Sequence, residues 1–98
     1  MKQRTGIPKK FQLLGHTITV CIVKKHRWRL KDTVGIWEPE KLRISILSGL
    51  PSTSLQQVFC HEWTHAMLDM MVHPLSTDEQ FVDQLAHLLQ QSLTTFEE

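Results

Sequence analysis

The segment from Ser54 to Met71, SLQQVFCHEWTHAMLDMM, restricts the fold most strongly, because it reads as one helix that is apolar almost all round. Such a helix has to be surrounded by the rest of the chain to hide its surface from water. With 98 residues, the chain is long enough for one core and too short for a large substrate cavity inside that core. We therefore expect a single domain over residues 1–98, built around this helix.

The segments on either side of this helix carry shorter patterns. Residues 16–23, HTITVCIV, alternate between apolar and polar side chains as a strand does, and FQLLG before them reads as a short partner strand. Residues 34–47 read as a hairpin that turns at 38–41, and residues 76–93 read as a second, amphipathic helix after Pro74. This order predicts an α+β fold, with a small antiparallel sheet of about three strands followed by two helices.

Four polar side chains interrupt the apolar surface of the first helix, and they share one stripe: His61, Glu62, His65 and Asp69. His61 and His65 form the pattern H-E-x-x-H, so their imidazoles lie one turn apart on the same face and can reach one metal ion. Glu62 flanks that face, where it could take a proton from a water that the metal activates. Polar groups on a buried helix need partners, and a metal ion would satisfy these together.

Two histidines leave a zinc site incomplete, because a catalytic zinc takes three protein ligands and a water. Asp69 would lie about 12 Å from His61 along the helix, too far to share the ion. We expect Asp69 to accept a hydrogen bond from His65 or to face solvent. The second helix offers Glu79 and Asp83, which are again one turn apart.

The residues alone leave open which of these two carboxylates completes the site. Residues 76–79, STDE, fit a capping box, in which Glu79 would bond back to the backbone of residue 76. A simple antiparallel fold-back at Pro74 puts Asp83 level with His65, and Glu79 about 6 Å lower along the helix.

H-E-x-x-H on one helix followed by E-x-x-x-D on the next resembles the glutamate-zincin arrangement of metallopeptidases. Nearly the whole chain is similar to short phage- and prophage-encoded zincin-like proteins, distant relatives of the ImmA/IrrE group, through IPKKF, LGHTITV, VGIWEPEKLRI and EQFVDQLAHLLQQ. The resemblance implies that Glu79 is the third ligand beside His61 and His65. It also implies that Asp83 accepts a hydrogen bond from the free ring nitrogen of His61.

These features predict a zinc-dependent metallopeptidase that binds one zinc ion per chain and cleaves a peptide or protein substrate, with Glu62 as general base. Peptide hydrolysis also needs a donor for the oxyanion, and the chain has no tyrosine. His87, on the stripe of Glu79 and Asp83, and His73 are candidate donors, although both also fit ordinary exposed histidines. The alternative is a metal-binding interaction module that cleaves little, which the small size and the missing tyrosine favour.

A peptide substrate in such a fold commonly adds as a strand to the sheet edge beside the active helix. Residues 43–47, RISIL, lead directly into that helix. Either this strand or a neighbouring strand could be that edge, and residues 43–47 fit an ordinary covered strand equally well.

Charge and composition bear on the partners and on the compartment. Residues 1–31 carry nine Lys or Arg and no acid, whereas residues 32–98 carry all ten acids. This asymmetry fits a solvated face, and it also fits a surface that binds nucleic acid or an acidic partner, which makes a nucleic-acid-associated phage protein a third hypothesis. Two cysteines, no apolar leader in residues 1–10 and no long apolar run predict a cytoplasmic protein without a membrane segment.

Overall fold

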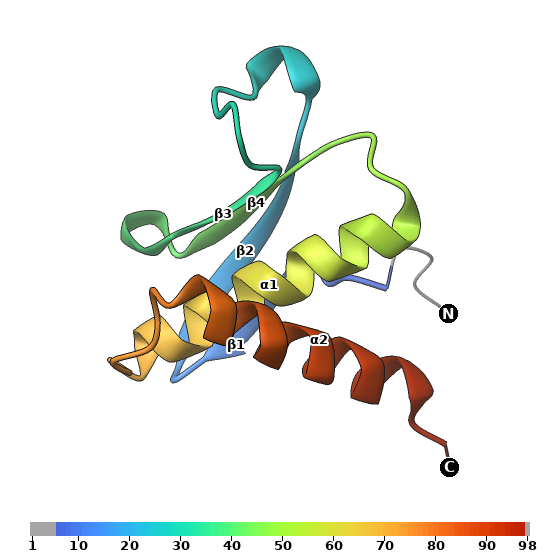
Figure 1. Cartoon of the computed structure of the whole chain (residues 1–98). Helices are drawn as coiled ribbons and strands as arrows, with labels where there is room; N and C mark the ends of the chain where they lie inside the picture. The colour runs from blue at the N-terminus through green and yellow to red at the C-terminus, as the bar shows by residue number, and fades with distance from the viewer. Residues whose placement is uncertain (1–5, 98) are drawn as a thin grey trace.

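The computed structural model describes residues 6–97, so Lys2 and Arg4 of the basic third lie outside the described residues. Its elements follow one another in the predicted order of strands and then helices (Figure 1). The elements are β1 (Lys10–Leu13), β2 (His16–Val23), η1 (Lys25–Arg27), β3 (Gly35–Glu38), η2 (Pro39–Lys41), β4 (Arg43–Leu47), α1 (Ser52–Met70) and α2 (Glu79–Thr95). The predicted α+β class is confirmed.

The sheet has four strands in the order β1-β2-β4-β3 and is mixed. The pairs β1–β2 and β3–β4 are antiparallel hairpins, as predicted, but β2 and β4 pair in parallel, with Thr19 opposite Arg43 and Val23 opposite Leu47. The small sheet before two helices is as predicted, with four strands where about three were expected, and the parallel pair β2–β4 makes it mixed where an antiparallel sheet was expected. The strand that carries the fully buried Ile44 and Ile46 takes the centre beside β2, which moves the short β3 to the edge.

Helix α1 lies between the sheet and α2, which explains why its surface is apolar almost all round (Figure 1). One side of α1 packs on the sheet through Phe59 and Cys60 against buried isoleucines of β2 and β4. The other side receives α2, whose Val82 and Ala86 are buried. The core therefore fixes the position of every residue that α1 and α2 present to the groove between them and β3.

The two helices begin differently from the prediction. Helix α1 begins at Ser52, directly after Pro51, and no side chain caps its first turn. Helix α2 begins at Glu79, and Asp78 caps it by accepting a hydrogen bond from the Phe81 backbone. The predicted capping box at residues 76–79 is absent, because Asp78 provides the cap and leaves the Glu79 side chain free for other contacts.

Neither described helix has the length and apolar composition that crossing a membrane would require. The two cysteines, Cys21 and Cys60, are both free thiols. Cys60 belongs to the core, and burial raises the pKa of its thiol.

Candidate metal centre

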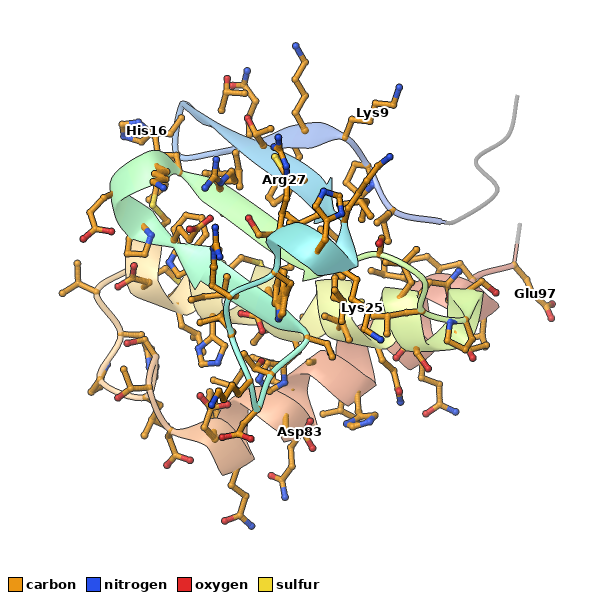
Figure 2. The ribbon with its side chains drawn as sticks, turned by 90° about the horizontal axis from the view of Figure 1, so that it is seen from above. Lys9, His16, Lys25, Arg27, Asp83 and Glu97 are labelled. Atoms are coloured by element: carbon orange, nitrogen blue, oxygen red, sulfur yellow. The ribbon has the colours of Figure 1, made fainter. Side chains whose placement is uncertain are left out.

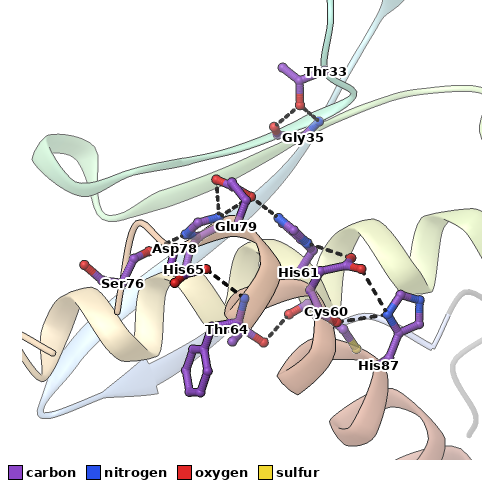
Figure 3. Close-up of polar contacts among 12 residues, drawn as sticks. Thr33, Gly35, Cys60, His61, Thr64, His65, Ser76, Asp78, Glu79 and His87 are labelled. Atoms are coloured by element: carbon purple, nitrogen blue, oxygen red, sulfur yellow. Dashed lines mark hydrogen bonds and ion pairs between the residues drawn. The ribbon is translucent and has the colours of Figure 1, made fainter. Parts of the chain in front are cut away.

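The two histidines of α1 converge on one carboxylate of α2 (Figure 3). His61 Nε2 lies 3.0 Å from Glu79 Oε1, and His65 Nε2 lies 3.2 Å from Glu79 Oε2. The ligand atoms of these three residues all lie within 4.8 Å of one another. In a tetrahedral zinc site, neighbouring ligand atoms lie about 3.3 Å apart, so this group could hold a metal ion with little movement.

The hydrogen bond of His65 shows which of its nitrogens is available to a metal. Its Nδ1 lies 2.8 Å from the backbone carbonyl oxygen of Ser76, and a carbonyl can only accept, so Nδ1 carries the proton. The neutral ring then directs the lone pair of Nε2 at the Glu79 carboxylate. Two acceptors at this distance need a cation between them, either a proton on the ring or a metal ion. The donor set therefore fits a metal.

Asp83 lies beside His61 on the side away from Glu79. Its Oδ1 is 3.5 Å from His61 Nδ1, and its Oδ2 is 3.6 Å from His87 Nδ1. Asp83 thus occupies the place of an acceptor for the second ring nitrogen of His61, and it does not belong to the group that could hold the ion.

The fold-back that put Asp83 level with His65 is wrong, because the chain reverses two residues earlier than Pro74. Val72 has a left-handed backbone (φ 55°), and the N–H of His73 donates to the Leu68 carbonyl, which closes the end of α1. With the reversal at Val72, α2 brings Glu79 opposite His65 and Asp83 opposite His61.

Glu62 is buried at 8% exposure and faces the edge strand β3. Burial raises the pKa of its carboxyl, while the two neighbouring histidines and the backbone N–H of Trp37 oppose this shift. The strand comes this close only because residue 35 is glycine. A Cβ on Gly35 would lie 2.5 Å from Val58 Cγ1 and 3.4 Å from Glu62 Oε2.

The outer edge of β3 runs along the candidate metal centre. The Leu47 N–H donates to the Val34 carbonyl, so the alternation of an antiparallel pair turns the polar backbone groups of Gly35 and Trp37 away from β4. The strand β4 is interior, which leaves β3 as the neighbouring edge strand that the sequence had allowed.

Of the two alternatives expected for Asp69, the hydrogen bond to His65 is not formed, and the side chain is exposed to solvent. Asp69 Oδ2 accepts a hydrogen bond of 2.9 Å from the indole Nε1 of Trp37, while the Ser76 carbonyl takes the Nδ1 proton of His65. Asp69 therefore ties the edge strand to the C-terminal part of α1.

Two cavities meet at the metal-ligand group, and together we call them the cleft. One, of about 280 Å³, lies beyond His61 and is lined by the segment 33–35, by α1 and by α2. The other, of about 450 Å³, lies beside His65 and Trp37. Glu62 lines both cavities, so an extended chain running along β3 from one cavity to the other would pass directly over it.

The candidate oxyanion donors lie less favourably. His87 Nδ1 donates to the Asp83 carbonyl, and its Nε2 lies 3.2 Å from Gln57 Nε2, from which a neutral ring accepts. A neutral His87 therefore presents no N–H to the centre, and a donor role would require the doubly protonated ring. His73 accepts from the Leu75 backbone and stacks on Phe81.

Three residues that contact the centre were missed by the sequence reasoning: Gly35, Trp37 and Ser76. An isolated glycine in a strand pattern signals a close backbone approach, so Gly35 carried a usable signal. Ser76 acts through its backbone carbonyl, which leaves no signal in the residue type.

Comparison of the chain with protein-family models, with curated proteins and with solved structures gives no match in any of the three. Any functional conclusion therefore rests on the motifs and on the geometry of the cleft.

Proposed function

We propose that this protein is a zinc-dependent metallopeptidase. The observation that carries the proposal is the convergence of His61 and His65 on Glu79, beside the buried Glu62. Two histidines and a glutamate form one of the ligand sets of catalytic zinc. Neither α1 nor α2 contains a Lys or Arg, so these helices supply no side-chain cation to balance the carboxylates.

A zinc ion held by these ligands would supply Lewis acidity, which lowers the pKa of a water and polarises a substrate carbonyl. The chain's own residues prepare the site for that chemistry. The Ser76 carbonyl fixes the ring of His65, and Asp83 lies where it can orient His61. Glu62 would take the proton from the attacking water and return it to the leaving amine.

The edge strand supports a peptide as the substrate. Backbone groups of Gly35 and Trp37 face away from β4 beside Glu62, where the Thr33 hydroxyl and the Glu62 carboxyl bind them. An extended peptide that adds to this edge as a further strand would replace those bonds. By the resemblance described above, the protein would be phage- or prophage-encoded and would act in the cytoplasm of the host.

A metal-binding interaction module is the second candidate, and one observation favours it. The Thr33 hydroxyl donates to the Gly35 carbonyl and the Trp37 indole donates to Asp69, so these two side-chain donors at the cleft are already engaged. The oxyanion role of His87 stays a prediction that depends on its protonation.

The test compares the wild-type protein with Glu62→Gln, which keeps the size of the side chain and removes its basicity. After zinc supplementation, both should hold about one zinc per chain. A mixed peptide library analysed by mass spectrometry should show new termini with the wild type, and the rate should fall by about three orders of magnitude or more in Glu62→Gln.

Three outcomes would count against these assignments. Zinc at less than about a tenth of the chains would refute the metal centre. Full zinc occupancy with no new termini in either protein would refute the peptidase and leave the module. Loss of zinc in Glu62→Gln would make Glu62 itself a ligand.

A further inference from the structure

The loop between β2 and β3 concentrates exposed cations without acidic partners. Within residues 24–31 it carries Lys24, Lys25, Arg27, Arg29 and Lys31. All five are exposed, and among residues 6–97 none of them forms an ion pair with a carboxylate. Figure 2 shows Lys25 and Arg27 of this loop in front of the sheet. We call residues 24–31 the basic loop.

The basic loop is attached to the wall of the cleft. The indole Nε1 of Trp28 donates to the Thr33 carbonyl at 3.0 Å, and the Thr33 hydroxyl donates to the Gly35 carbonyl at 2.9 Å. Thr33 and Val34 line the cavity beyond His61. These bonds connect the cations to the cleft wall, so they do not belong to an independent tail.

The opposite wall of the cleft carries the opposite charge. Helix α2 forms that wall below α1, while the basic loop stands above β3 (Figure 1). Glu79 and Asp83 are 70% and 57% exposed there, and neither helix has a Lys or Arg. A nucleic acid, which is charged along its whole length, would face these carboxylates if it lay in the cleft. A peptide, in contrast, can carry its acidic side chains on the side that faces the basic loop and uncharged side chains on the side that faces Glu79 and Asp83.

From this arrangement we infer that the basic loop docks an acidic segment of the peptide substrate. The segment would flank the scissile bond on the side that enters the cavity beyond His61, because Thr33 and Val34 join the loop to that cavity. The cations of the basic loop would attract acidic substrates, favour them over neutral ones and speed their association. This inference rests on the proposed peptidase function, and it adds a substrate class to it.

The test uses zinc-loaded Glu62→Gln protein, so that bound peptides stay intact. The probes are a fluorescein-labelled peptide with glutamates on one side of a central leucine, the same peptide with glutamines, and a labelled DNA duplex. The loop variant combines Lys25→Gln, Arg27→Gln and Arg29→Gln. The control variant combines Lys9→Gln, Lys10→Gln and Lys41→Gln, which removes the same charge from exposed positions elsewhere.

At about 50 mM salt, the acidic peptide should bind about tenfold more tightly than the glutamine peptide. The loop variant should lose this preference, and the control variant should keep it within about twofold. Equal losses in both variants would assign the effect to net charge and overturn the inference. No preference between the peptides, or tighter loop-dependent binding of DNA, would overturn it as well. Because binding is measured without turnover, failure of the peptidase proposal would appear separately, as absent cleavage by the wild type.

Discussion

Two clusters of polar side chains cross between elements of this fold, and they differ in how their charge is balanced. On the sheet, Glu38 of β3 accepts hydrogen bonds from Arg43 Nε at 2.8 Å and from the Ser45 hydroxyl at 2.9 Å, both on β4. The guanidinium lowers the pKa of the Glu38 carboxyl. The negative charge of Glu38 is therefore balanced by a cation of the protein itself, Arg43.

Among residues 6–97, no Lys or Arg pairs with the carboxylates of the cleft cluster. Glu79 faces the Nε2 atoms of His61 and His65, and the buried Glu62 beside them has a raised pKa, because burial outweighs its favourable neighbours. The pKa values of Glu38 and Glu62 are thus shifted in opposite directions within one fold. The comparison teaches that a carboxylate balanced by Arg43 has its partners within the fold, whereas the group of His61, His65 and Glu79 could hold a metal ion.

Zinc affinity should separate the two clusters most strongly. Glu79→Ala removes a ligand and should lower the affinity by about a thousandfold or more, while Asp83→Ala should lower it by about 10–100-fold through the orientation of His61. Glu38→Ala should leave it unchanged. Competition with a chromogenic chelator measures all three. A larger loss in Asp83→Ala than in Glu79→Ala would exchange their roles.

Thermal stability gives the next largest difference. Zinc at about 100 times its Kd adds about 2.7 kcal/mol, so a chelator should lower the melting temperature of so small a domain by about 10 °C or more. His65→Ala should melt at that lower temperature with or without chelator. Glu38→Ala should be destabilised by about 1 kcal/mol, and chelator should still lower its melting temperature as it does in the wild type. Melting curves that do not respond to chelator would show that no ion joins the helices.

The pH dependence of the chelated protein should show the smallest effect, with opposite signs for the two glutamates. The lowered pKa of Glu38 gives stability that is present above its unfolded value, about 4.3, and is lost as the pH falls through the folded value. The raised pKa of Glu62 makes stability decrease as the pH rises from the unfolded towards the folded value. Glu38→Gln should therefore flatten the acid side of the melting profile. Glu62→Gln should flatten the profile at higher pH, between the unfolded and the folded pKa of Glu62. Identical profiles for both variants would contradict the opposite pKa shifts of the two glutamates.

The elements were predictable from the sequence because their signals are local. Alternation in residues 16–23, the proline turn at 38–41 and the apolar surface of α1 each specify an element without reference to the rest of the chain. The parallel pairing of β2 with β4 was not predictable, because it depends on which strand of the β3–β4 hairpin is buried more completely. Periodicity within one strand contains no information on its neighbours.

In the candidate metal centre, too, the local features were predictable from the sequence and the long-range ones were not. The shared face of His61 and His65 follows from helix geometry, and so does the spacing of Glu79 and Asp83. The positions of these pairs relative to each other depended on the left-handed Val72, which no residue preference indicates. The hydrogen bond between Trp37 and Asp69 joins residues 32 positions apart, and no sequence pattern predicts it.

The parallel pairing of β2 with β4 also has a kinetic consequence. Both hairpins close over short turns, but the centre of the sheet forms only when Thr19 meets Arg43 and Val23 meets Leu47. Closing the chain between these strands costs entropy, so we expect that pairing to be the slow step of folding, and the segment that has to close carries the five cations of the basic loop. Salt screens their mutual repulsion, so the refolding rate in a stopped-flow experiment should rise with ionic strength. A surface suited to docking an acidic chain would thus delay the assembly of the sheet that carries it.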